Sequence, residues 1–310
     1  MGTPAVRDPE VSQTPQPASQ RSSRLSLAKR PWLGLLPVTA WQAAFYLVPL
    51  VLIILTSFWV MHEFRLSPDW TTDNYRRLMA SPGVLRAFWT SITVSFTVVA
   101  ISTVIAYALA YVIAFHVPRR YRLLLLIALI APFWTNYLVR AYAWQLILGS
   151  NGLLNYLLVN SGLTAEPLRI LYTHTATRIG LVHLVTPLMT LMLYVTLENI
   201  NPRLMDAAAD LGARGFRRFI HVVLPLSRPG LAVGLMLTFV LVFTDFISPA
   251  VLGGQARRTV TQLVVDSIQW SVNYPRGAAI SVLMILVALV AVGIIGWLVA
   301  GGRSSLSEKR

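Results

Sequence analysis

Residues 206–213 read DAAADLGA, and residues 222–225 read VVLP after a short basic segment; together they are the most informative part of the chain. This stretch is polar and rich in alanine, yet it lies between two long apolar runs. A segment of that kind is typical of a surface that a partner contacts, and not of a membrane span. The chain is therefore interpreted outward from this loop.

The local signals around the loop predict a short helix followed by a turn. Asn201 before Pro202 is a favourable N-cap with a first-turn proline. Asp206 and Asp210 would lie early in the helix, where the positive end of the helix dipole stabilises acidic side chains. Alanines at 207, 208, 209 and 213 allow close backbone approach by a partner, and Gly212 permits a sharp turn. Leu224-Pro225 is expected to end the element and Pro229 to start the next span. The alternative is an amphipathic helix that lies on the membrane surface.

The composition places the chain among polytopic membrane proteins. Of its 310 residues 55% are hydrophobic and 12% charged, and the mean hydropathy is +0.63. The apolar residues form blocks of about 20 or more, the length that a spanning helix requires. No alternation typical of a transmembrane β-barrel is present in the sequence. The prediction is an all-α fold with six transmembrane helices at about residues 38–61, 88–115, 121–148, 177–197, 229–250 and 278–300.

The first thirty residues differ from the rest of the chain. Residues 1–30 are rich in Pro, Ser, Gln and Thr and have little apolar content, which predicts a disordered cytoplasmic tail. The first apolar block follows this tail without a small-residue cleavage site, so we expect a retained helix and no signal peptide. The domain organisation is thus a tail, 1–30, and a six-helix transmembrane domain, 31–310, with a cytoplasmic coupling loop at 198–228.

The distribution of Lys and Arg predicts the orientation. Of the 26 basic residues, sixteen belong to the two tails and to the loops on one side, eight to the opposite loops, and Arg140 and Arg178 lie within spans. By the positive-inside rule both termini and the Asp206 loop are cytoplasmic. The net charge of +14 then reflects topology and contact with anionic membrane lipid, and no nucleic-acid partner is expected.

Several kinds of chemistry are not predicted. There is no cysteine, the five histidines have no ligand spacing, and no G-x-x-x-x-G-K-[ST] phosphate loop occurs. The sequence therefore predicts no metal site, no cofactor and no enzymatic activity, and the energy for any transport would come from ATP hydrolysis in another subunit.

The loop residues carry a resemblance to a known family. Their pattern resembles the EAA loop of ABC importer permeases, EAA-x3-G-x9-I-x-LP, with Asp206 in place of Glu and Val222 in place of Ile. The resemblance implies a MetI-like permease fold and a coupling helix that docks on a cytoplasmic ATPase. The residues to which it assigns this coupling are Asp206, Ala207, Ala208, Gly212, Ala213, Val222, Leu224 and Pro225.

Further motifs resemble a subfamily over most of the chain from about residue 38. Pro132-Phe-Trp-Thr-Asn136, Asn151-Gly-Leu-Leu-Asn155, and Asp245-Phe246 through Leu252-Gly-Gly254 look like the spermidine/putrescine permeases of the PotB type. This resemblance implies a second, homologous permease subunit, an ATPase dimer, a periplasmic substrate-binding protein, an inner-membrane location and transport by alternating access. Permeases for ferric iron or phosphonate-type compounds are similar, and a stand-alone channel or secondary carrier is the alternative from another class.

The chain's own chemistry offers a candidate path for a polyamine. Asp245 is expected within the fifth span, where a carboxylate is costly enough to indicate function. Aromatic faces attract ammonium groups, and Phe133, Tyr137, Arg140 and Trp144 would share one helical stripe, with Trp134 offset from it. Two alternatives stay open. The aromatic stripe could pack helices, and Asp245 could form an ion pair with Arg140. For an anionic cargo, Arg140 and Arg178 would be the contacts instead.

Overall fold

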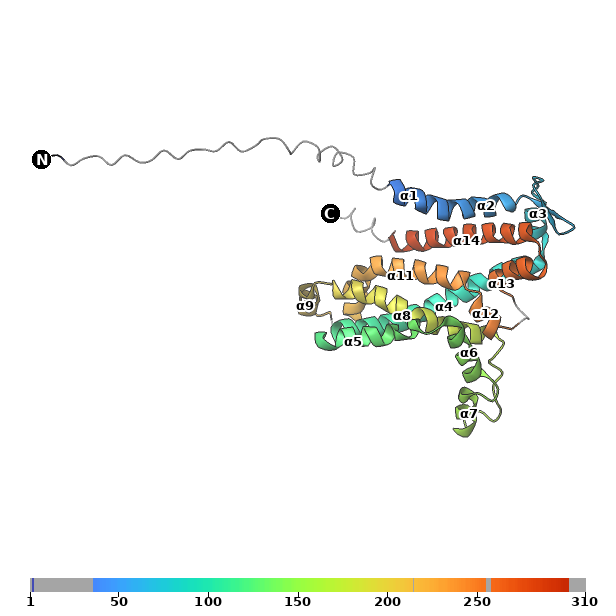
Figure 1. The fold of residues 1–310 in the computed structure, drawn as a ribbon. Helices are drawn as coiled ribbons and strands as arrows, with labels where there is room; N and C mark the ends of the chain where they lie inside the picture. Colours follow the sequence, from blue (N-terminus) through green and yellow to red (C-terminus); the bar gives the residue numbers. More distant parts are fainter. Residues whose placement is uncertain (1, 3–35, 214, 255–257, 301–310) are drawn as a thin grey trace. The chain divides into compact units, whose positions relative to one another are not determined.

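The computed structural model describes residue 2 and residues 36–213, 215–254 and 258–300 (Figure 1). The tail predicted to be disordered, residues 1–30, lies outside the described residues except for residue 2. The chain forms two units, Met1–Leu52 and Ile53–Arg310, and the second contains both candidate sites.

Most of the described chain is helical, as predicted. The only β-structure among the described residues is a two-stranded antiparallel hairpin, β1 (Val60–His62) and β2 (Arg65–Ser67). Its two connecting residues, Glu63 and Phe64, both have positive φ, the geometry that matches the twist of a hairpin. The helices of the first part are α1 (Leu36–Gln42), the π-helix η3 (Ala43–Leu47), α2 (Val48–Thr56), α3 (Asp73–Ala80), α4 (Pro82–Phe115), α5 (Arg119–Ile130), the 3₁₀-helix η4 (Ala131–Trp134), α6 (Tyr137–Leu148) and α7 (Leu153–Asn160). Those of the second part are α8 (His174–Glu198), α9 (Pro202–Asp210), α10 (Phe216–Arg218), the π-helix η5 (Phe219–Val223), α11 (Leu224–Thr244), α12 (Ile247–Leu252), α13 (Val260–Val265), the π-helix η6 (Asp266–Trp270) and α14 (Tyr274–Ala300).

The described residues contain five continuous helices that are long and apolar enough to cross a membrane, and a bent pair that makes six if it is one span. This agrees with the six blocks predicted from hydropathy. The continuous helices are Pro37–Thr56, Pro82–Phe115, His174–Glu198, Phe216–Thr244 and Tyr274–Val299.

The third span is not the single helix that the sequence predicted. Arg119–Trp134 and Tyr137–Asn160 meet at an angle of 92°. Pro132 lies in the tight η4 turn, Thr135 is extended, and the Asn136 side chain caps the new helix by accepting a hydrogen bond from the Leu138 N–H at 2.8 Å. The break falls inside the predicted aromatic stripe, because Phe133 precedes it and Tyr137 follows it.

The fifth span also has different ends from those predicted. It is helical from Phe216 to Thr244, so Pro225 lies in the first turn of α11 and Pro229 lies inside the helix. The π-helix η5 ends at Val223, one residue before the Leu224-Pro225 pair, and a proline in the first turn of a helix is tolerated, so Pro225 does not end the element. Asp245 is the first residue after the helix and not an intrahelical residue.

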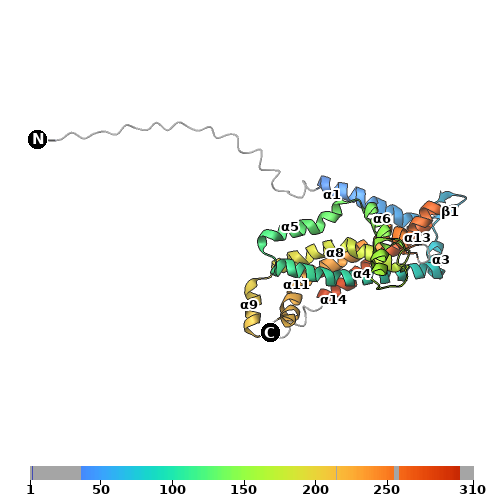
Figure 2. The ribbon, with the colours of Figure 1, turned by 90° about the horizontal axis from the view of Figure 1, so that it is seen from below.

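The long helices of the second unit pack side by side: α8 packs against α4 and α11, α4 and α11 also contact each other, and α14 packs against α11 (Figures 1 and 2). One buried cluster joins α4, α8, α9 and η5 near one end of this bundle, and another joins α3, α4, α11, α13 and α14 near the other. Helix α9 lies at the first end, while α6, α12 and α13 lie toward the opposite end (Figures 1 and 2). The two candidate sites are therefore at different ends of the bundle.

Candidate functional site

The predicted coupling loop contains a short helix with defined ends. Asn201 caps α9 by accepting a hydrogen bond from the Arg203 N–H at 3.0 Å, and Pro202 is its first residue, as the sequence indicated. At the other end Gly212 has φ +81°, the Ala213 N–H donates to the Ala208 carbonyl at 2.8 Å, and the Gly212 N–H donates to the Ala209 carbonyl at 2.9 Å. This is a Schellman motif, which a glycine allows without strain. The predicted turn at Gly212 is confirmed.

One side of α9 is attached to the membrane helices. Met205 is 7% exposed and belongs to the cluster of buried side chains that includes Leu197 of α8 and Val223 of η5. Phe219 packs edge-on against Tyr107 of α4, with ring centroids 5.5 Å apart. A close-packed core thus joins α9 to α4, α8 and the start of α11.

The other side of α9 is largely exposed. Asp206 and Ala207 are exposed, Ala208 and Ala213 are partly exposed, and Leu211 is 89% exposed. Phe216, the first residue of α10, is 76% exposed. Two large apolar side chains beside small residues form a surface that a protein partner could cover. The other predicted coupling residues are partly buried and do not belong to this face: Val222 lies in η5, and Leu224 and Pro225 begin α11.

The second candidate site is the break between η4 and α6, which faces the end of α11. The Tyr137 hydroxyl donates to Asp245 Oδ1 at 2.6 Å and lies 2.8 Å from Ser248 Oγ. The Ser248 N–H donates to Asp245 Oδ2 at 3.0 Å, and Thr261 Oγ1 donates to the Asp245 carbonyl at 2.8 Å. Tyr137 and Asp245 are thus brought together, as a common pathway would require. The role of Ser248 was missed, although its position three residues after an Asp is a local capping signal.

The ion pair between Arg140 and Asp245, left open as an alternative, is not formed. Within the described ranges Asp245 has no ion pair, and Arg140 donates to the Thr135 carbonyl at 3.4 Å. Its guanidinium lies 5.5 Å from the Phe133 ring centroid and 5.8 Å from that of Tyr137, the geometry of cation–π contacts. Its Nε and Nη1 are buried without a hydrogen-bond partner.

The two predicted tryptophans lie in different surroundings. Trp144 Nε1 donates to His183 Nδ1 of α8 at 3.3 Å, and Trp134 is 78% exposed. Trp144, His183 and Arg178 line a cavity of about 630 Å³ between α4, α5, α6 and α8. His183 had no signal in the sequence, because its proximity to Trp144 depends on the packing of α6 against α8.

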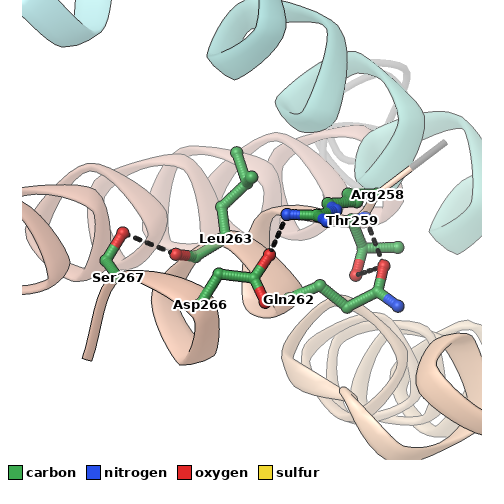
Figure 3. Close-up of polar contacts among 6 residues, drawn as sticks. All are labelled: Arg258, Thr259, Gln262, Leu263, Asp266 and Ser267. Atoms are coloured by element: carbon green, nitrogen blue, oxygen red, sulfur yellow. Dashed lines mark hydrogen bonds and ion pairs between the residues drawn. The ribbon is translucent and has the colours of Figure 1, made fainter. Parts of the chain in front are cut away.

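The loop before α14 contains a small polar network that restrains one predicted surface charge. The Arg258 side chain donates to Asp266, and the Thr259 N–H donates to Gln262 Oε1 at 2.8 Å to cap α13 (Figure 3). Ser267 Oγ donates to the Leu263 carbonyl at 2.7 Å in the same view. Arg258 therefore has a carboxylate partner in its own loop.

Taken together, the spanning helices and the loop between α8 and α11 define a multi-span helical membrane protein with an exposed helical projection at one end. Residues 106–301 match the sequence model of the family described as "Binding-protein-dependent transport system inner membrane component". The chain belongs to this family of inner-membrane components of binding-protein-dependent transport systems, and it is a multi-pass inner-membrane protein.

Curated relatives and solved structures agree with this assignment. The chain is 36% identical to the spermidine/putrescine transport system permease protein PotB of Haemophilus influenzae, over 82% of this chain and 88% of that protein. It is 32% identical to PotB of Escherichia coli K12, over 81% of this chain and 90% of that protein. A bacterial ABC transporter involved in alginate import has the same fold, with a TM-score of 0.72, 19% identity, and coverage of 88% of this chain and 96% of that one.

Proposed function

We propose that this chain is a permease subunit of an ATP-driven importer that carries polyamines of the spermidine and putrescine class across the inner membrane. The relatives named for these substrates match most of this chain and nearly all of their own length. A ferric-iron or phosphonate cargo, and a stand-alone channel or carrier, are not favoured by these relatives. The chain itself has no phosphate-binding motif, so the ATPase is a separate cytoplasmic dimer.

The observation that carries the coupling part of this proposal is the two-sided environment of α9. Met205 is packed into the membrane helices, while Asp206, Ala207 and Leu211 point away from them into solvent. An ATPase that holds the exposed face can move α9 as a lever, and the buried face passes the movement to α4, α8 and α11. Alternating access to the two sides of the membrane then follows from the tilt of these helices.

The coupling role is tested by filling the exposed face of α9. Ala207→Trp adds a large side chain where the ATPase would dock, and it should abolish co-purification of the ATPase and ATP-dependent uptake while the permease remains inserted. The matched control is Ser150→Trp, an exposed position of the opposite end, which should retain the ATPase. Normal uptake by Ala207→Trp would contradict the docking role, and ATP hydrolysis by the purified chain alone would contradict the need for a separate motor.

We further propose that the substrate path runs along the break before α6, with Asp245 as the group that attracts the cargo. Asp245 is held by the neutral donors Tyr137 and Ser248, so its charge is not cancelled by an ion pair within the described chain. An ammonium group could bind this carboxylate and the aromatic rings of Tyr137, Trp134 and Trp144, each ring contributing about 0.5–2 kcal/mol. Arg140, over the Phe133 and Tyr137 rings, would occupy that position until a cation displaces it.

The pathway is tested by Asp245→Asn, which removes the charge and keeps one of the two oxygens that accept hydrogen bonds from Tyr137 and Ser248. We expect an uptake defect at least tenfold, with normal assembly, and no defect in Asp73→Asn, an exposed acid of α3. Normal uptake by Asp245→Asn would refute its role in transport, and lost uptake together with lost assembly would show that Asp245 is structural.

The remaining partners and the orientation complete the proposal. A periplasmic binding protein would deliver the cargo, and the alginate transporter was also solved in complex with its alginate-bound periplasmic protein. A second, homologous permease subunit would complete the pathway, and both termini would be cytoplasmic. Reporter fusions at the two ends of the chain test the orientation, and a periplasmic signal from either fusion would refute it.

A further inference from the structure

A cavity of about 770 Å³ lies between α4 and the segment formed by α10, η5 and α11. It is separate from the pathway residues, and it shares only Phe216 with the exposed surface described at α9. Its floor is aromatic, since Phe219 packs against both Tyr107 and Tyr111, with centroid distances of 5.5 and 6.1 Å. The side of the cavity toward the middle of α4 is apolar and open, and Val104 there is 72% exposed.

The end of this cavity nearest the coupling loop is basic. Arg218 lines it, and the Arg218 Nε is buried without a hydrogen-bond partner in the described structure. His116 lines the same cavity just beyond the end of α4, and Arg119 and Arg120 begin the next helix. No Asp or Glu is among the described residues that line the cavity, so nothing there neutralises Arg218.

We propose that this cavity binds an anionic phospholipid, with its headgroup phosphate at Arg218 and an acyl chain along α4. Helices α4 and α11 are spanning segments, so the open apolar side of the cavity faces hydrocarbon. A guanidinium donates two parallel hydrogen bonds to a phosphate oxygen pair, and the unpartnered Nε is one of the two donors that this geometry uses. A wholly apolar helix would leave Arg218 without a partner, and a cationic polyamine would be repelled by it.

The location also gives the lipid a regulatory effect, and this consequence rests on the proposed coupling function. Phe216, Arg218 and Phe219 belong to the segment that joins α9 to α11. A lipid bound here would hold that segment against α4, so the movement of α9 would depend on the anionic lipid content of the membrane.

The binding is tested on the full chain in neutral detergent, without the ATPase. Equal amounts of phosphatidylglycerol and phosphatidylcholine with identical acyl chains are added, and the retained lipid is counted by native mass spectrometry. We expect retention of phosphatidylglycerol to exceed that of phosphatidylcholine about fivefold, the effect of one basic residue near the membrane surface. Arg218→Ala should remove the preference and Arg218→Lys should keep it, whereas Ala108→Trp, which fills the apolar part, should reduce retention of both lipids.

The matched control is Arg217→Ala, because Arg217 is exposed, adjacent in sequence and absent from the cavity wall. Equal retention of the two lipids by the wild-type chain would overturn the proposal, and so would an equal loss in the Arg217 and Arg218 variants, which would indicate diffuse charge. Displacement of the bound lipid by a second permease subunit would show that the cavity is a protein interface. If Arg218→Ala does not fold, the wild-type preference and the Ala108→Trp variant still decide. Because no readout requires ATP, failure of the lipid site is distinguishable from failure of the coupling role.

Discussion

Gly230 is the position where a single added methyl group should most disturb the helix packing. Gly230 and Gly234 form a G-x-x-x-G pattern on α11, on the side that packs against α8, as small residues do where membrane helices approach closely. A Cβ at Gly230 would lie 1.8 Å from Thr196 Oγ1 and 2.7 Å from Thr196 Cβ. Carbon atoms require about 3.5–4.0 Å, so the two helices would have to separate by about 1 Å at this point.

The expected cost of Gly230→Ala follows from these distances. Overpacking of this kind costs about 1–3 kcal/mol, and the better helix propensity of alanine returns about 0.5–1 kcal/mol. We therefore expect a net loss of about 1–2 kcal/mol in the free energy of unfolding. Transport should fall as well, because α8 and α11 are the helices that carry α9.

The assay is unfolding of the purified chain in mixed micelles by increasing amounts of a denaturing detergent. The control is Gly293→Ala in α14, where an added Cβ meets no atom within 4 Å, so this variant should be unchanged or slightly more stable. The double variant Thr196→Gly with Gly230→Ala exchanges the small residue between the helices and should recover part of the loss. Equal stability of Gly230→Ala and Gly293→Ala, or no recovery in the exchange, would refute the close-packing argument.

Three further predictions concern the loops. Met205→Ala should lower the free energy of unfolding by about 2–5 kcal/mol and uncouple uptake from ATP hydrolysis, because it removes the buried anchor of α9. Uptake by the exposed-site control Leu204→Ala should stay normal. Gly212→Ala should lower the free energy of unfolding by about 1–2 kcal/mol because φ is +81°, and Gly212→Asn should lower it less, as measured by unfolding in the same micelles. An equal loss in the two variants would argue against the left-handed turn. Asn155→Ala should increase proteolysis of the loops on both sides of α7, because this 1%-exposed side chain makes three hydrogen bonds of 2.8–3.0 Å to the backbone of Gly149 and Leu168, each worth about 1 kcal/mol. Cleavage no faster than in the exposed-site control Asn160→Ala would show that the Asn155 bonds do not hold the loops.

The amino-acid sequence by itself determined the class of the protein and the ends of α9. Long apolar blocks predict spanning helices because a helix in lipid must be about 20 residues long whatever its neighbours are. Asn201, Pro202 and Gly212 predicted the start and the end of α9 because capping depends on hydrogen bonds within a few residues of the chain. Such local signals need no knowledge of the tertiary fold.

The tertiary structure alone decided how the intramembrane polar residues are partnered. The sequence left an ion pair between Arg140 and Asp245 open, but the 92° bend at residues 135–136 places Tyr137 against Asp245 and leaves Arg140 over aromatic rings. Helical periodicity holds only while the helix is continuous, and contacts between residues more than 100 positions apart depend on how α6 and α12 pack. The pairing of Trp144 with His183, the anchoring of Met205, and the fit of Gly230 against Thr196 have the same origin, because each joins segments whose proximity no local pattern specifies.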